Sequence, residues 1–274
     1  MNDYKTTLLA HLETYKNVVL GVHEDGVWFR NNKPYPHILP SDKAELNLVS
    51  GVRALWAASP KARGVKRHRD FHHLNSSQAF AINLFFPLLH ARDAHASLLR
   101  ALGVTAGVVE DWNFEEIVDH AELTNFDVVL QLGGHRRVFI EVKLTESEFG
   151  AVSDSDTQRR RRDLIYLPRL AAKVSASALE IPHFFNMYQL LRNASYAATD
   201  RDQVLFIVPR QNTVVASAAD RFTSKVVSED YRPLVRTVFA EELVENLLNS
   251  DLPSNVRAAV GETADKYLLR LSKV

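Results

Sequence analysis

The chain of 274 residues contains no cysteine and has no net charge, with 33 Lys and Arg against 33 Asp and Glu. Without cysteine, a disulfide scaffold is excluded, and the additional lack of an H-E-x-x-H motif argues against a zinc centre. A balanced charge argues against a surface that is basic throughout and binds nucleic acid in general. No internal repeat and no low-complexity segment occurs, so a repeat architecture is not expected.

Long apolar runs are missing as well. No stretch approaches the roughly 20 apolar residues that cross a bilayer. Residues 1–16 carry charge throughout, whereas a signal peptide has an apolar middle. We therefore expect a cytoplasmic protein without a membrane segment.

The residues that are present describe a globular protein, with 46% hydrophobic and 9% aromatic residues. At about 150 residues per domain, the length allows one elaborated domain or two small ones. We divide the chain into an N-terminal helix and hairpin elaboration, a core, and a C-terminal helical extension packed on the core, at residues 1–72, 73–210 and 211–274. The core pattern is helix, three strands, helix, strand, with the strands predicted at residues 108–118, 126–132, 137–144 and 203–209.

The second and third strands form a predicted hairpin whose register follows from the alternation of apolar and polar residues. A three-residue loop at 133–135 gives one face that is wholly apolar. A two-residue loop would move Asp127 to that apolar face, where an unpaired carboxylate costs several kcal/mol. The three-residue loop predicts the apolar pairs Phe126 with Val142, Val128 with Ile140, and Leu130 with Val138.

The same register places two acids on the other face of the hairpin. Asp127 lies opposite Glu141, and Lys143 follows Glu141 on the same side of the strand, about 7 Å further on. Two carboxylates this close repel each other and need a positive charge between them. Lys143 supplies one, and hard oxygen ligands also suit Mg²⁺. A bound metal and an ammonium beside an attacking water are the parts that hydrolysis of a phosphodiester requires.

Asp127 on the second core strand, the run Glu141-Val142-Lys143 on the third and the order of the elements resemble the PD-(D/E)XK nuclease superfamily. The resemblance implies an α/β, restriction-endonuclease-like core with a mixed sheet and with helical additions at both ends. Segments similar to a bacterial restriction-endonuclease-like subfamily are residues 73–88, 140–146 and 188–197.

The resemblance also implies a function. It predicts a metal-dependent endonuclease that uses Mg²⁺, with Mn²⁺ as a substitute, and that acts on DNA by preference. Asp127, Glu141 and the Val142 carbonyl would hold the metal, and Lys143 would lie at the attacking water. Many members carry a glutamate on the first core helix, but residues 76–89 contain no acid. For a further acid, Glu146 and Glu116 are both open.

Two further groups of residues are candidates for supporting roles. Gln189, Arg192 and Asn193 form a polar stripe on a predicted helix, which is either a solvated face or a set of contacts to phosphate or to the site. Asn75 or Ser76 can cap a helix and Gln78 can complete a capping box, and the same helix N-terminus is a natural seat for phosphate.

Basic residues cluster on both sides of the core. Such clusters are either solvated or neutralise the phosphates of a nucleic acid. The candidates for nucleic-acid binding are Lys66, Arg67, Arg69, Arg159, Arg160 and Arg161.

Two other functions fit the sequence. The first is a nucleic-acid-binding or assembly module that keeps the nuclease-like fold but has lost turnover, which the missing helix glutamate suggests. The second is an unrelated α/β enzyme acting on a small phosphorylated substrate. Because cutting both strands of a duplex takes two active sites, a homodimer is a reasonable expectation for a nuclease.

Overall fold

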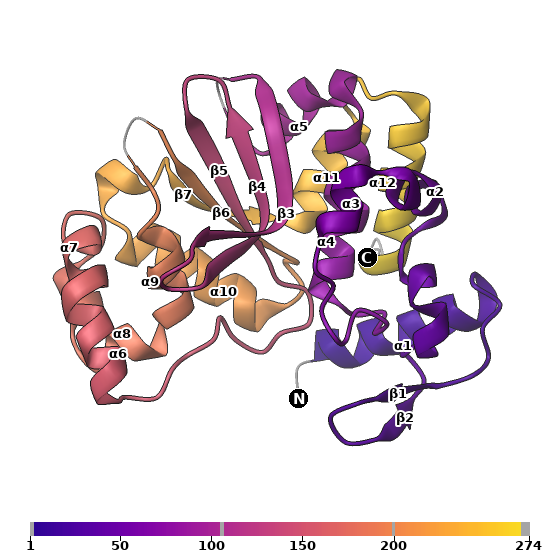
Figure 1. Cartoon of the computed structure of the whole chain (residues 1–274), viewed down its shortest axis with the longest axis horizontal. Helices are drawn as coiled ribbons and strands as arrows, with labels where there is room; N and C mark the ends of the chain where they lie inside the picture. The colour runs from indigo at the N-terminus through magenta and orange to yellow at the C-terminus, as the bar shows by residue number, and fades with distance from the viewer. Residues whose placement is uncertain (1–2, 105–106, 199–200, 270–274) are drawn as a thin grey trace.

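A five-stranded mixed sheet forms the centre of the molecule (Figure 1). The computed structural model describes residues 3–104, 107–198 and 201–269. The strands follow the order β3-β4-β5-β6-β7, in which β3 to β5 are antiparallel and β5 to β7 are parallel. Their bounds are Val109–Asp119, Thr124–Leu132, Arg136–Val142, Gln203–Val208 and Val235–Phe239. The predicted α/β core with a mixed sheet is confirmed.

Helices precede, interrupt and follow the sheet along the chain. None of those within the described residues is both long and apolar enough to span a membrane. The α-helices are α1 (Asp3–Val18), α2 (Ser50–Ala58), α3 (Pro60–Gly64), α4 (Ser77–His90), α5 (His95–Ala101), α6 (Asp156–Arg161), α7 (Leu167–Leu170), α8 (His183–Asn186), α9 (Tyr188–Ala194), α10 (Thr213–Arg221), α11 (Ala240–Leu248) and α12 (Ser254–Tyr267). A small hairpin of β1 (Gly26–Trp28) and β2 (Lys33–Tyr35) follows α1.

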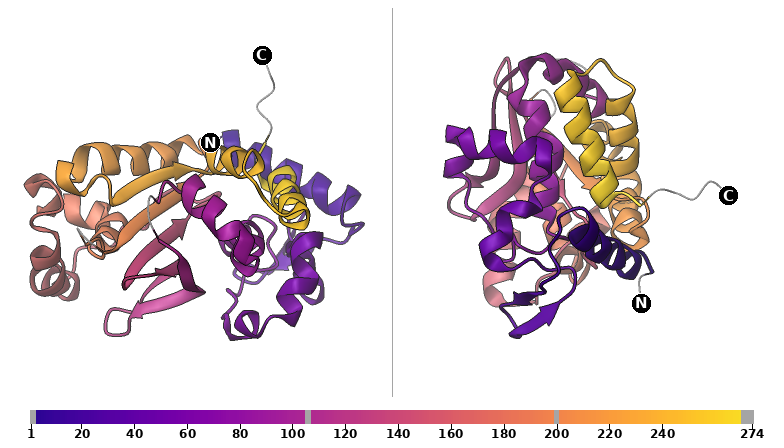
Figure 2. Two further views of the ribbon diagram at one scale, coloured as in Figure 1. Left: turned by 90° about the horizontal axis from the view of Figure 1, so that it is seen from above. Right: turned by 90° about the vertical axis from the view of Figure 1, so that its right-hand side faces the viewer.

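Each face of the sheet is covered by its own set of helices (Figures 1 and 2). On one face, Val128, Leu130 and Ile140 share a core with apolar residues of α1, α2, α4, α11 and α12. On the other face, Val129 and Phe139 pack with residues of α8, α9 and α10. Both faces are apolar because a strand buried on both sides sends its alternate side chains into two different cores.

The fifth strand, β7, is not predicted by the sequence pattern. It comes from the part of the chain expected to be a helical extension, and it pairs in parallel with β6. The division into three parts stays a prediction, and its residues 1–2, 105–106, 199–200 and 270–274 lie outside the described ranges.

The hairpin of β4 and β5 has the predicted register. Its ladder pairs Val128 with Ile140, Leu130 with Val138, and Gln131 with Arg137. The three-residue loop is Gly133-Gly134-His135, and Gly134 and His135 have positive φ values of 78° and 60°.

One expectation about the hairpin is wrong. The ladder ends at the pair Val128–Ile140, so Phe126 does not pair with Val142. Phe126 instead turns to the opposite face, where it stacks on Phe139 with 4.9 Å between ring centroids. Strict alternation fails at this end of β4 because the strand leaves its ladder with β5 there.

Candidate active site

Glu141 lies near the end of β5, and Lys143 is the residue that follows this strand. Their side chains lie on the same side of the sheet and contact each other. The Lys143 Nζ is 2.9 Å from Glu141 Oε1, and both side chains are largely buried. Burial disfavours the ammonium, but the carboxylates of Glu141 and Glu146 outweigh it and raise the pKa of Lys143 above its ordinary value. Lys143 is therefore charged at neutral pH and acts as a donor.

Helix α9 supplies two amides that hold Glu141. Gln189 Nε2 donates to Glu141 Oε1 at 2.7 Å, and Asn193 Nδ2 donates to Glu141 Oε2 at 3.0 Å. Of the predicted stripe on this helix, these two residues reach the acid. Arg192 does not: its guanidinium lies over the Tyr188 ring, 5.9 Å from the centroid, and its buried Nε has no partner within the described residues.

Asp127 closes the site from β4. Its Oδ2 accepts a hydrogen bond from the Val142 N–H at 2.6 Å, in place of the direct opposition to Glu141 that the sequence predicts. Burial, followed by the charges of Glu141 and Glu115, raises the pKa of Asp127 well above its usual range. Because the N–H and C=O of a strand residue point the same way, the Val142 carbonyl also faces the β4 side.

A third acid, Glu115 on β3, belongs to this neighbourhood and was missed by sequence reasoning. Its side chain is 7% exposed. Gln78 Nε2 donates to Glu115 Oε1 at 2.9 Å and Asn125 Nδ2 to Oε2 at 2.9 Å. The open alternative Glu116 accepts from Asn113 Nδ2 instead. Alternation along β3 does not single out Glu115, because this residue has a positive φ and lies outside the ladder with β4.

The N-terminus of α4 is capped by Ser76, whose hydroxyl accepts from the Ala79 N–H at 3.3 Å. Gln78 does not complete a capping box, contrary to the sequence expectation. Its amide accepts from the His68 N–H at 2.8 Å and donates to the Lys66 carbonyl at 3.0 Å. Gln78 therefore ties the basic loop 66–68 to Glu115.

The six basic candidates divide into two groups. Arg159 pairs with Asp154 at 2.6 Å, Arg161 lies 3.7 Å from Glu122, and Arg67 pairs with Glu45. These three charges are already neutralised. The other three candidates, Lys66, Arg69 and Arg160, form no ion pair with any described residue. The guanidinium carbon of Arg69 lies 5.1 Å from the centroid of the Phe29 ring.

The donor set suits a hard divalent cation. Asp127 Oδ1 accepts no hydrogen bond from the described residues, so one carboxylate oxygen is available to a ligand. No group of three Asp, Glu, His or Cys side chains in residues 3–104, 107–198 and 201–269 could hold a metal ion. A cation here would therefore also use the Val142 carbonyl and water, which Mg²⁺ retains readily.

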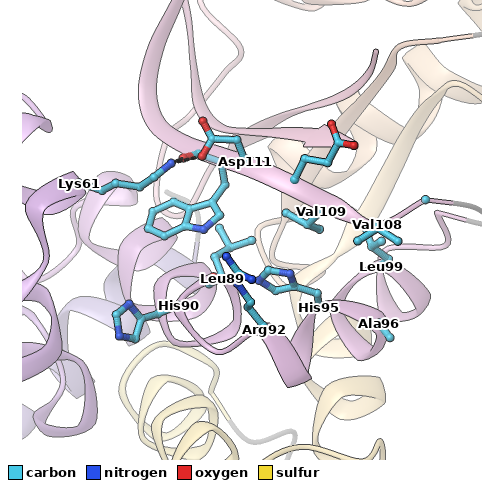
Figure 3. Close-up of a pocket in the computed structure, with 13 residues that line it drawn as sticks. Lys61, Leu89, His90, Arg92, His95, Ala96, Leu99, Val108, Val109 and Asp111 are labelled. Carbon is cyan, nitrogen blue, oxygen red and sulfur yellow. Dashed lines mark hydrogen bonds and ion pairs between the residues drawn. The ribbon is translucent and has the colours of Figure 1, made fainter. Parts of the chain in front are cut away.

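A pocket of about 450 Å³ is lined by Arg69 and Ser76 and by Thr145 and Glu146, which follow Lys143 closely in the chain. A larger pocket of about 660 Å³ lies between β3 and the segment from α4 to α5 (Figure 3). None of the predicted site residues lines that second pocket. Its lining includes Lys61, His90, Arg92, His95, Glu110 and Trp112.

Comparison with known proteins gives one match. Residues 9–268 match the family described as restriction endonuclease associating with ARP. No curated protein and no solved structure matches the chain. The family match spans the N-terminal elaboration, the core and the C-terminal helices together.

Proposed function

Because the chain belongs to the family of restriction endonucleases associating with ARP, we propose that it is a metal-dependent endonuclease that hydrolyses phosphodiester bonds in DNA. The observation that carries this proposal is the meeting of Asp127, Glu141 and Lys143 at neighbouring ends of β4 and β5. Family membership supports the nuclease-like activity. The three side chains supply the reason for metal dependence.

Each residue has a task in the proposed reaction. Asp127, Glu141 and the Val142 carbonyl would hold Mg²⁺ or Mn²⁺, which polarises a phosphoryl oxygen and lowers the pKa of a bound water. Lys143 keeps its proton and donates to the attacking water or to a phosphate oxygen, where negative charge develops. Gln189 and Asn193 keep the Glu141 side chain fixed.

Contact with DNA would come from the basic residues that form no ion pair with any residue that the structure describes. Lys66, Arg69 and Arg160 are the side chains that can neutralise phosphates without breaking an ion pair. Ser76 contributes through the N-terminus of α4. These contacts would fix the position of the backbone but would not read a sequence.

Assembly and location are part of the same proposal. Cleavage of both strands calls for two active sites, so we propose a homodimer in the cytoplasm. We also propose that this chain associates with ARP, as the description of its family states. Sedimentation of the purified protein with and without a DNA duplex measures the stoichiometry.

A plasmid-nicking assay tests the activity. Wild-type protein is incubated with supercoiled DNA in Mg²⁺, in Mn²⁺ or in EDTA, and Asp127→Asn, Glu141→Gln and Lys143→Ala are compared with it. We expect cleavage with metal only, and a loss of about a hundredfold or more for each variant. Lys225→Ala, which removes an exposed lysine elsewhere, is the control. Wild-type rates in Lys143→Ala would disprove the role of that ammonium.

The runner-up is a binding module without turnover. It is favoured by the absence of an acid on α4, where Gln78 and Asn83 lie instead, and by the three donors that already surround Glu141. In that case the same incubation shifts the mobility of the DNA in every metal condition and never nicks it.

A further inference from the structure

Glu115 has a backbone conformation that an extended strand does not require. Its φ is +54°, in the left-handed region, in the middle of β3. Its neighbours Phe114 and Glu116 pair with Val128 and Phe126, so Glu115 is opposite Asp127 but does not join the ladder. A residue other than glycine in this region costs about 1–3 kcal/mol, and surrounding contacts must hold it there.

The Glu115 carboxylate is buried beside another acid. Its charge adds to that of Glu141 in raising the pKa of Asp127. Gln78, Asn125 and His68 all hydrogen-bond to the Glu115 oxygens, with His68 Nε2 at 3.2 Å. Asp127, Glu141 and Glu115 repel one another when they are charged, and a bound cation would relieve this repulsion.

A second observation on the opposite side of the site also points to a ligand. Asn193 is fully buried, and its amide orientation is fixed because Nδ2 donates to Glu141. Its Oδ1 has no hydrogen-bond donor among the described residues. A buried carbonyl oxygen without a donor costs about 1–3 kcal/mol unless water or a ligand supplies one.

We propose that Glu115 is a positioning residue for the divalent cation, acting through its fixed charge on the ion held by Asp127 and Glu141. This inference rests on the proposed nuclease function. Glu115 acts through space or through the waters of the ion, because the acids do not converge as three direct ligands. The kink in β3 lies opposite Asp127, whose pKa the Glu115 charge raises.

A purely structural role is the competing explanation. Glu115 links β3 to the basic loop through Gln78 and His68, and that link alone would anchor the loop. His68 is half-exposed, and His68→Ala removes its side-chain contact with the Glu115 carboxylate while the Gln78 bond and the Glu115 charge stay in place. The two explanations therefore predict opposite results for His68→Ala.

The test measures Mn²⁺ affinity of the full-length protein by electron paramagnetic resonance. For Glu115→Gln we expect an affinity about 10 to 100 times weaker, the range found for residues that tune a metal from beyond its ligands. Glu115→Gly gives the same loss and is the safer variant to fold, because glycine adopts the positive φ without strain. Glu116→Gln, the neighbouring acid, and His68→Ala should bind Mn²⁺ as the wild type does.

The outcomes separate this inference from the function on which it rests. If wild-type protein binds no Mn²⁺, the proposed nuclease function fails. If wild type binds but Asp127→Asn does not, and Glu115→Gly binds as tightly as wild type, the role of Glu115 is overturned. Equal losses in His68→Ala and Glu115→Gly assign Glu115 to the anchoring of the loop and overturn it as well.

Discussion

The Glu141 side chain is held by neutral donors as well as by an ammonium. A buried carboxylate is costly unless it is hydrogen-bonded, and the two amides of α9 supply those bonds without adding positive charge. The net charge near Asp127 and Glu141 thus stays negative enough to attract a cation.

At the residue scale, Gln189→Ala tests this arrangement. Loss of the amide frees Glu141 to rotate, so we expect the Mg²⁺ concentration for half-maximal nicking to rise about 10-fold or more. Excess Mg²⁺ should restore much of the rate. Asn186→Ala, which removes an exposed amide from α8, is the matched control. An unchanged Mg²⁺ requirement would show that Glu141 needs no support from α9.

At the scale of elements, the β4–β5 hairpin brings Asp127, Val142 and Lys143 together. Its loop depends on two residues with positive φ. Gly134 adopts this conformation without steric strain, whereas the Cβ of His135 makes it unfavourable. Apart from Gly134 and its two neighbours in the chain, no described residue has an atom within 4 Å of the position that a Cβ on Gly134 would take. A substitution there changes the backbone energy alone.

The loop therefore predicts stability changes of opposite sign. Gly134→Ala should lower the free energy of unfolding by about 1 kcal/mol, and His135→Gly should raise it by a similar amount. Urea denaturation followed by circular dichroism measures both. A gain in stability from Gly134→Ala would mean that the loop differs from the one described.

At the scale of the whole molecule, the two ends of the chain build one core around α4. Helix α12 packs on α4 and α2, and Asn83 Nδ2 of α4 donates to the Tyr267 hydroxyl at 3.0 Å. The buried Lys266 donates to the Asn47 side chain at 2.6 Å. The C-terminal helix is thus part of the body that supports the site.

Truncation after residue 253 should abolish cooperative folding. It removes the buried side chains of Val256, Val260 and Tyr267, worth about 2 kcal/mol each. The sum is comparable to the roughly 5–15 kcal/mol by which whole domains are stable. Thermal unfolding by near-ultraviolet circular dichroism tests this. A sharp transition in the truncated chain would show that residues 1–253 fold without α12.

Two histidines beside the β1–β2 hairpin predict acid sensitivity. Burial, followed by the charge of His73, lowers the pKa of His37 to about 4, and burial followed by His72 lowers the pKa of His73 to about 4. Unfolded histidine titrates near pH 6.5, so between pH 6.5 and 4 the unfolded state binds more protons. Stability should therefore fall as the pH falls through this range.

The double variant His37→Asn, His73→Asn should flatten that dependence, as measured by urea unfolding at successive pH values. His183→Asn, which changes an exposed histidine on α8, should keep the wild-type slope. An unaltered slope in the double variant would refute the assignment of the acid sensitivity to these two side chains.

The sequence by itself determined what period-two alternation and burial can determine. The apolar face of residues 128–130 against 138–140 fixes the β4–β5 register, and with it the shared side of Glu141 and Lys143. The same reasoning does not reach β7, five residues whose strand identity depends on a neighbour, β6, distant in sequence.

Only the tertiary structure decided which side chains meet this hairpin from elsewhere. Whether Gln189 and Asn193 were a solvated stripe or partners of Glu141 depended on how α9 packs on the sheet. The turn of Phe126 to the other core and the kink at Glu115 come from backbone conformations outside the regular strand, which alternation cannot encode. Local pattern sets the faces of an element, whereas packing between distant elements selects the groups that share a site.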